Sequence, residues 1–172
     1  MKKILGLILI VAVFSSCSRK VAFTSNIQNE YKFSEDNLKK IQFYTSDEIV
    51  LVRTKKEGNV TVEQGTLLIK NEDNVEKIII KKNTPCVLEK VIDNNKFLYS
   101  FEYGANRVLL FGNDSNGYYS LMAKEWKNKV GEVKYTDKSY LTVNGNVYLL
   151  IKVKNLRKLK GRQRTVKGVK VK

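Results

Sequence analysis

Apolar residues recur from about residue 34 onward in short runs rich in Val, Ile, Leu, Tyr and Phe, separated by Asn, Asp and Gly. Such runs, starting about every ten residues, are typical of strands joined by tight turns. No helical pattern is long enough for a crossover between parallel strands. The sequence therefore predicts an all-β fold, a single antiparallel sandwich or barrel of about ten short strands. The candidate strands are 48–54, 59–63, 66–70, 75–81, 86–92, 96–103, 107–111, 118–124, 131–135, 140–143 and 147–153.

One segment places an aromatic residue at every second position. Successive side chains of a strand point to opposite faces, so these four residues would share one face. The stripe could fill a core or form a binding platform, and the alternation with Leu98 and Ser100 favours the core. Its members are Phe97, Tyr99, Phe101 and Tyr103.

A second segment, 140–151, has Asn144-Gly145 between two apolar runs. Asn-Gly suits the type I′ turn of a two-residue hairpin, because both central residues need positive φ. The sequence therefore predicts a β-hairpin across this turn.

One short helical turn is predicted ahead of the strands. Ser34 can serve as the N-cap, Glu35 and Asp36 occupy the first turn, and Leu38 and Ile41 fall on one side.

The N-terminus carries the pattern of a secretory signal. Lys2 and Lys3 precede an apolar run over 4–14, and two small residues, Ser15 and Ser16, precede Cys17. The run is too short to span about 30 Å of hydrocarbon, so it is read as a leader and not as part of the fold.

The sequence Phe14-Ser15-Ser16-Cys17 resembles the lipobox of bacterial lipoproteins, although Phe14 stands where Leu is commoner. A lipobox that departs from the common pattern in this way is similar to the looser motifs of Bacteroidota lipoproteins. The resemblance implies cleavage after Ser16 and lipid attachment to Cys17, and the alternative is an ordinary signal with an incidental cysteine. Ser18 in place of Asp implies transfer to the outer membrane. Lipoproteins that Bacteroidota export to the cell surface tend to carry acidic residues just after the cysteine. Ser18-Arg19-Lys20 has none, so the resemblance implies a protein that faces the periplasm.

Four regions follow from these patterns. Residues 1–16 are the cleaved signal peptide, 17–33 a lipidated tether, 34–154 the β-domain and 155–172 a basic C-terminal tail. The proposed tether is polar and has few large apolar residues. If extended at roughly 3.3 Å per residue it would reach some 40 Å, far enough to contact the cell wall.

Charge is concentrated at the C-terminal end. The formal net charge is +15, and no Asp or Glu follows Asp137. A basic run of this kind repels itself and is expected to end the compact domain near Asn155, although three late valines leave a final edge strand open. The residues expected to bind an anionic partner are Lys152, Lys154, Arg157, Lys158, Lys160, Arg162, Arg164, Lys167, Lys170 and Lys172.

The partner of such a tail depends on the compartment. In the cytosol it would suggest nucleic acid, but export removes that partner. In the periplasm the candidates are lipid headgroups, peptidoglycan carboxylates and acidic faces of envelope proteins, each basic residue contributing on the order of 1 kcal/mol. A tail that only keeps the protein soluble is the alternative.

Candidate chemistry is sparse. The chain has no histidine, so common triads and zinc sites are missing, and we expect no metal, no cofactor and no enzyme activity. Asn113-Asp114-Ser115-Asn116-Gly117 lacks the ligand spacing of a calcium loop and is interpreted as a turn. Cys86 lies among apolar residues and is interpreted as a small buried hydrophobe. A pair of acids joined by folding would still allow hydrolase chemistry.

Three functions remain open: an envelope binding or structural module, an accessory subunit of an outer-membrane protein complex, and, less favoured, a carboxylate-dependent hydrolase. Short phrases, Phe101-Glu102-Tyr103-Gly104 and Gly131-Glu132-Val133-Lys134-Tyr135, also resemble small uncharacterised β-rich lipoproteins of Bacteroidota. These phrases transfer no functional residue.

Overall fold

The computed structural model describes residues 19–54, 60–63, 66–69, 75–93 and 95–160. The predicted signal and Cys17 lie outside the described residues, as do the residues of the predicted tail from 161 onward.

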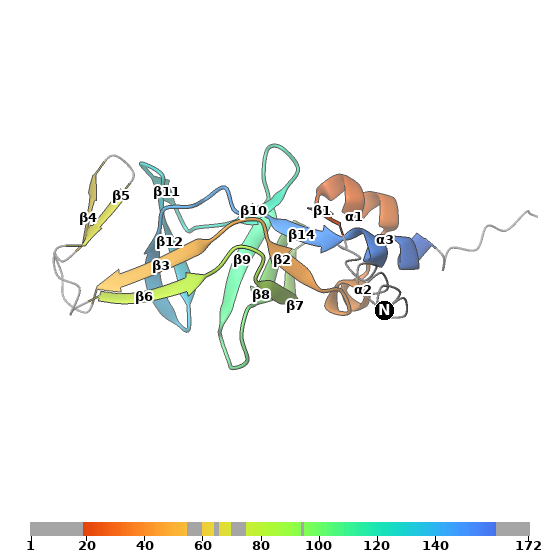
Figure 1. Cartoon of the computed structure of the whole chain (residues 1–172), viewed down its shortest axis with the longest axis horizontal. Coiled ribbons are helices and arrows are strands. Elements are labelled where there is room, and N and C mark those ends of the chain that lie inside the picture. The colour runs from red at the N-terminus through yellow and green to blue at the C-terminus, as the bar shows by residue number, and fades with distance from the viewer. Residues whose placement is uncertain (1–18, 55–59, 64–65, 70–74, 94, 161–172) are drawn as a thin grey trace, which may run out of the picture.

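The fold is mostly β and consists of two antiparallel sheets arranged like a sandwich (Figure 1). This confirms the predicted fold class, although the described residues alone form fourteen strands where about ten were expected. The seven-stranded sheet has the order β1 (Lys20–Ala22), β14 (Leu149–Lys152), β2 (Phe43–Thr45), β7 (Pro85–Asp93), β8 (Lys96–Ser100), β9 (Val108–Asn113) and β10 (Tyr119–Leu121). The five-stranded sheet has the order β11 (Trp126–Lys127), β12 (Val130–Tyr135), β13 (Lys138–Thr142), β3 (Ile49–Thr54) and β6 (Val75–Ile80).

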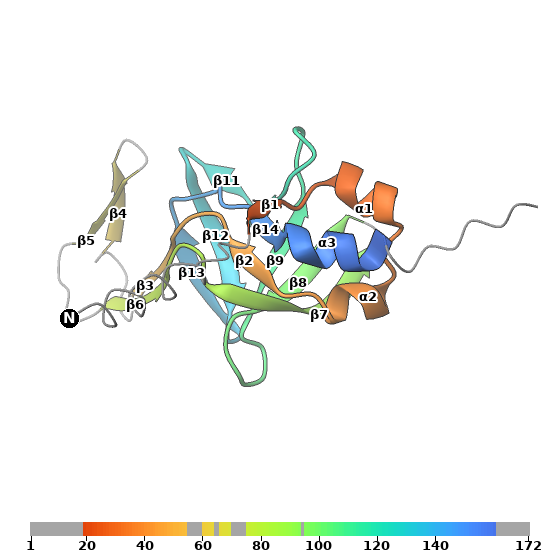
Figure 2. The same cartoon turned by 45° about the vertical axis from the view of Figure 1, so that its right-hand side comes forward.

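The remaining elements lie at the two ends of the molecule. A separate hairpin, β4 (Val60–Glu63) and β5 (Thr66–Ile69), extends beyond the five-stranded sheet. Three helices, α1 (Ser25–Tyr31), α2 (Glu35–Lys39) and α3 (Val153–Lys160), gather at the opposite end, as both views show (Figures 1 and 2).

The outer strands of the seven-stranded sheet curve toward one another. The Tyr119 amide donates to the Phe23 carbonyl at 3.3 Å, and the Leu121 amide donates to the Val147 carbonyl at 2.8 Å. Single bridges, Thr24 with Tyr118 and Ser120 with Tyr148, replace a continuous ladder, so the sheet stays open.

Aromatic rings fill the space inside this curved sheet. The ring of Phe23 lies 4.9 Å from Tyr119 and 5.1 Å from Phe43, and Phe43 in turn lies 5.0 Å from Tyr99 (centroid distances). All four rings are at most 1% exposed. Burial of such large rings supplies much of the hydrophobic stabilisation, and their stacked, tilted and edge-to-face contacts add a smaller contribution.

The predicted helical turn is confirmed as α2. Ser34 is its N-cap, and the Ser34 hydroxyl accepts a hydrogen bond from the Asn37 amide at 3.3 Å. Leu38 and Ile41 are buried in the core, 2% and 5% exposed.

The predicted tether at 17–33 is wrong from residue 20 onward. Lys20–Ala22 forms β1, Phe23 is completely buried, and Thr24 caps α1 by accepting a hydrogen bond from the Ile27 amide. The polar residues of this segment serve as helix cap and solvent face, while a few well-spaced apolar residues reach the core. Sequence composition alone hides this, because the segment is apolar only where it contacts the sheet.

The predicted hairpin across Asn144-Gly145 is also wrong, because β13 and β14 belong to different sheets. The Asn144 side-chain amide donates to the Glu48 carbonyl at 3.0 Å, within a connection that carries the chain from one sheet to the other. Two-residue turns with positive φ at both positions lie earlier in the chain. One is Asn128-Lys129, between β11 and β12, and the other is Thr136-Asp137, between β12 and β13.

The aromatic stripe is core for half of its length. Phe97 and Tyr99 are buried and Phe101 packs against the core, whereas Tyr103 is fully exposed. The alternation ends because β8 ends at Ser100 and the chain turns.

We expect Phe23→Ala to lower the free energy of unfolding by about 3–5 kcal/mol, because it removes a fully buried ring from the aromatic core. Urea unfolding of the two proteins measures the difference. Tyr103→Ala is the matched control, since its side chain is exposed and its loss should change little. An equally small effect at Phe23 would mean that the segment around it is a tether after all.

Candidate functional site

One end of the molecule, called the basic end below, carries Lys20, Lys152, Lys154 and Arg157. It is built from the first and the last described strand and from α3, which follows them. β1 pairs with β14 in antiparallel register, with Lys20 opposite Lys152. The Val153 amide continues the ladder by donating to the Arg19 carbonyl at 3.0 Å. The start of the fold, two residues after Cys17, therefore lies beside the start of α3.

Two lysines of this end share one aromatic ring. The Nζ atoms of Lys20 and Lys152 lie 3.8 Å and 4.9 Å from the centroid of the Tyr44 ring. A cation over an aromatic face is attracted to it, by about 0.5–1 kcal/mol at exposed sites. Lys20 Nζ also donates to Asn83 Oδ1 at 3.0 Å. The two ammonium groups are thus held close together despite their like charge.

The predicted boundary near Asn155 is wrong, because α3 continues the fold to Lys160. Val153 and Leu156 are three residues apart on one helix face, and Leu156 is 7% exposed and part of the core. Lys154 and Arg157 are exposed. The basic run is therefore an amphipathic helix at first and not a solvated tail.

The structure thus places three of the predicted basic side chains at this end: Lys152 in β14, and Lys154 and Arg157 on α3. The backbone of Lys158 and Lys160 also belongs to α3. The remaining predicted residues lie outside the described residues, namely Cys17, Arg162, Arg164, Lys167, Lys170 and Lys172.

Cys86 behaves as the sequence predicts. It is 2% exposed in the core, and burial raises the pKa of its thiol well above the ordinary value. A protonated, enclosed thiol packs as a small hydrophobe.

The segment Asn113–Gly117 is a turn, as predicted. Asp114 Oδ1 accepts hydrogen bonds from the amides of Asn116 and Tyr118, and Oδ2 accepts one from the Ser120 hydroxyl at 2.6 Å. Among the residues that the structure describes, no group of three or more His, Cys, Asp or Glu side chains is placed to hold a metal ion.

Two carboxylates serve as anchors for tyrosines. Glu102 Oε1 accepts from the Tyr135 hydroxyl at 2.6 Å while Glu102 Oε2 pairs with Arg107 at 2.8 Å. Burial, and then the bond to Glu102, raise the pKa of the Tyr135 hydroxyl. Glu76 accepts from the Tyr140 hydroxyl at 3.0 Å and pairs with Arg53 at 3.3 Å. These acids are used to hold the fold together.

Another two acids, Glu132 and Asp137, line one cavity of about 380 Å³ together with Lys124 and Lys134. Asp137 Oδ2 accepts a hydrogen bond from the Asn106 side chain at 2.6 Å. This arrangement does not test the hydrolase alternative, which stays a prediction.

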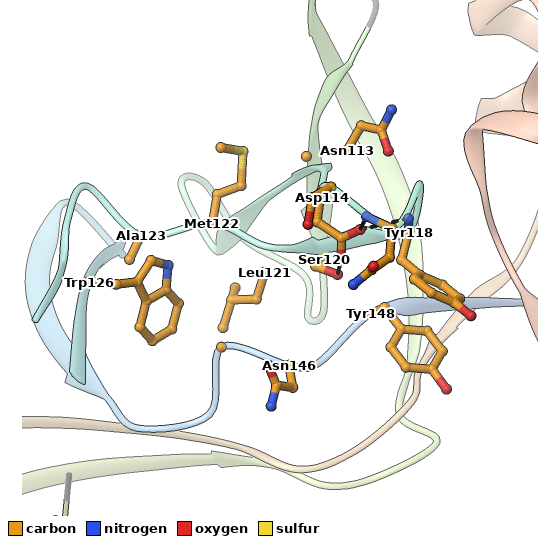
Figure 3. Close-up of a pocket in the computed structure, with 14 residues that line it drawn as sticks. Asn113, Asp114, Tyr118, Ser120, Leu121, Met122, Ala123, Trp126, Asn146 and Tyr148 are labelled. Atoms are coloured by element: carbon orange, nitrogen blue, oxygen red, sulfur yellow. Dashed lines mark hydrogen bonds between the residues drawn. The ribbon is translucent and has the colours of Figure 1, made fainter. Parts of the chain in front are cut away.

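A second cavity, of about 520 Å³, was not anticipated from the sequence (Figure 3). The turn after β9, the segment through β10 and the connection before β14 surround it. The indole of Trp126 lies at one end, and the rings of Tyr118 and Tyr148, 5.0 Å apart, lie at the other. The sequence signals for this cavity are two Asn-rich turns, 113–117 and 144–146, which only the tertiary structure brings together.

The indole of Trp126 packs closely against two glycines. A Cβ atom placed on Gly131 would lie 2.7 Å from the indole ring, and one on Gly145 would lie 2.8 Å from it. Glycine at both positions therefore allows the ring its close approach. The indole remains 38% exposed.

Comparison with known protein families, with curated proteins and with solved structures found no match to this chain. Within the described part of the chain, no helix has the length and apolar character needed to cross a membrane.

We expect Leu156→Ala to lower the free energy of unfolding by about 2 kcal/mol, because it removes a nearly buried side chain that docks α3. Thermal or urea unfolding measures this, with Lys154→Ala on the exposed face of the same helix as control. If both variants were as stable as the parent protein, α3 would not be part of the cooperative fold.

Proposed function

We propose that the protein is a lipid-anchored module of the outer membrane that faces the periplasm and uses its basic C-terminal end to contact anionic envelope components. Among these components, the headgroups of the anchoring membrane are the ones that the fold favours. The supporting observation is the pairing of β1 with β14, which brings the segment that follows Cys17 next to the origin of the basic helix.

Distance is the first argument for headgroups. Lys20, the first residue of β1, is three residues after Cys17, and three extended residues span at most about 10 Å. Charges attract a surface effectively within the Debye length, about 8 Å at physiological salt. A lipid on Cys17 would therefore hold the basic end close enough to the headgroups for its charges to act.

The folded segment 20–33 argues in the same direction. An extended tether of some 40 Å would have lifted the basic end toward the cell wall, but most of that length is part of the domain. Peptidoglycan remains the second anionic candidate, and it would have to come to the membrane surface to meet these charges.

Charge is the second argument. No acidic residue follows Asp137, while ten Lys and Arg residues lie between Lys152 and Lys172. Each basic residue near an anionic surface contributes about 1 kcal/mol, so several acting together are sufficient for adhesion.

A second candidate function, an accessory subunit of an outer-membrane protein complex, is favoured by the edge of β7. β2 pairs with β7 only at Pro85 and Cys86, so β7 beyond Cys86 has no strand on that side among the described residues. Val87 and Ile92 on this strand are 42% and 49% exposed. The helix α2 packs against part of β7, and the remainder of this edge, with its exposed apolar side chains, can accept a strand of a partner protein.

Lipidation is tested by labelling. We expect cells that express the full chain to incorporate radioactive palmitate into it, and Cys17→Ser to abolish the label, because the thiol is the acceptor. Mass spectrometry of the purified protein should find a chain that begins at residue 17. An unlabelled protein that retains its leader would contradict the anchor.

Headgroup contact is tested with unlipidated protein, residues 18–172, and vesicles containing about one third anionic lipid. We expect binding that is lost on pure phosphatidylcholine and that weakens as salt rises from about 0.15 M to about 1 M. Lys154→Gln with Arg157→Gln should weaken binding by up to about thirtyfold, since two charges contribute about 2 kcal/mol.

The matched control is Lys129→Gln with Lys134→Gln, which removes the same charge from β12 and from the turn before it, away from the helices. Equal losses in both double variants would show that net charge alone matters and not the basic end. Failure to bind anionic vesicles, together with salt-sensitive sedimentation with purified peptidoglycan, would identify the wall as the partner.

A further inference from the structure

We propose that the cavity between Trp126 and the Tyr118–Tyr148 pair, the aromatic cavity, binds a neutral saccharide. Aromatic rings lie at its two ends, and its lining also has polar side chains and the apolar Leu121, Met122 and Ala123 (Figure 3). Its volume of about 520 Å³ lies within the range of small-molecule sites, about 300–1,000 Å³. This proposal does not depend on the basic end or on the lipid anchor.

Trp126 supplies a preformed stacking surface. Its indole lies against Gly131 and Gly145, where a Cβ atom would come within 2.8 Å of the ring, so its position is set by the backbone. An aromatic face carries partial negative charge and attracts the weakly positive C–H groups of a sugar ring. A large apolar side chain that packs against backbone and is still 38% exposed is suited to this contact.

Amide side chains supply the hydrogen bonds that sugar hydroxyls need. Asn113, Asn116 and Asn146 line the cavity, and within the described part of the chain their side-chain amides have no hydrogen-bond partner. An amide both donates and accepts, and a hydroxyl does the same, so the two match in either direction.

Asp114 adds a fixed acceptor. Its carboxylate offers roughly four lone-pair positions. Three of them accept hydrogen bonds, from the backbone amides of Asn116 and Tyr118 and from the Ser120 hydroxyl. These bonds hold the carboxylate in place and leave capacity for about one further donor, such as a sugar hydroxyl.

The charge of the lining decides against an acidic ligand. The chain has 32 Lys and Arg residues, but none is among the fourteen residues that line the aromatic cavity, while Asp114 is. A phosphate or carboxylate ligand would meet no compensating cation here and one carboxylate of like charge. Aromatic faces, amides and a single acceptor instead suit an uncharged ring with many hydroxyls.

The single tryptophan of the chain makes the test direct. Trp126 is the only indole, so its fluorescence reports on this cavity alone. The full mature chain, held in mild detergent, is titrated with neutral trisaccharides of glucose and of N-acetylglucosamine, and with the acidic trisaccharide of galacturonic acid. We expect a saturable change in Trp126 emission with at least one neutral sugar and a weaker response, or none, with the acidic one.

Calorimetry extends the test to variants without the indole. Trp126→Ala should weaken binding at least about tenfold, and Asn113→Ala with Asn146→Ala should weaken it while leaving the core intact, because both amides lie on the exposed rim. Tyr103→Ala, an exposed aromatic outside the aromatic cavity, is the control and should bind as the parent protein does.

Three outcomes would overturn the proposal: no saturable response to either neutral sugar up to about 10 mM, equal binding of the acidic sugar, or unchanged binding in both cavity variants. The first would mean that the cavity is only a hollow between two turns. None of these outcomes bears on vesicle binding, so this proposal and the membrane proposal can fail separately.

Discussion

The antiparallel pairing of β1 with β14 is the constraint on which the rest of the structure depends. It ties the beginning of the described chain to its end, places Phe23 in the middle of the aromatic core and continues without a break into α3. If this pairing were lost, the ring of Phe23 would leave its neighbours Phe43 and Tyr119, and the outer strands of the seven-stranded sheet would lose the bonds that bring them together. One ladder of three residue pairs therefore supports the core and also places the first described residues beside the start of α3.

That pairing divides the molecule into regions of different character. The helical end collects basic side chains from β1, β14 and α3, within a few residues of the predicted lipid-bearing cysteine. The aromatic cavity has no basic side chain in its lining, although the protein carries a large excess of positive charge. Separation of this kind is expected when one surface attracts an anionic layer and another receives an uncharged ligand, since each would otherwise interfere with the other.

Sequence patterns were interpreted correctly where the hydrogen bonds or the periodicity behind them involve residues that are close in the chain. The cap at Ser34 predicts α2 because the bond to the Asn37 amide involves residues three apart. Most strands were predicted because alternation needs no knowledge of the partner strand. Three of the four shortest strands, β1, β2 and β11, and the helices α1 and α3 were missed, because strands of two or three residues carry little periodicity and because polar or basic residues dominate these helices. At Asn144-Gly145 the turn chemistry suggested a hairpin, but the choice of sheet is made by distant strands.

The sequence by itself determined the all-β class, the short capped helix, the buried cysteine and the concentration of charge at the C-terminal end, because composition and short-range periodicity are properties of the chain alone. Only the tertiary structure decided that residues 20–33 belong to the domain, that the basic run begins as a docked helix, and that two Asn-rich turns and one tryptophan enclose a cavity. These features depend on contacts between residues far apart in the chain, such as Lys20 with Lys152, and a linear pattern carries no record of which distant partner will bury each side chain.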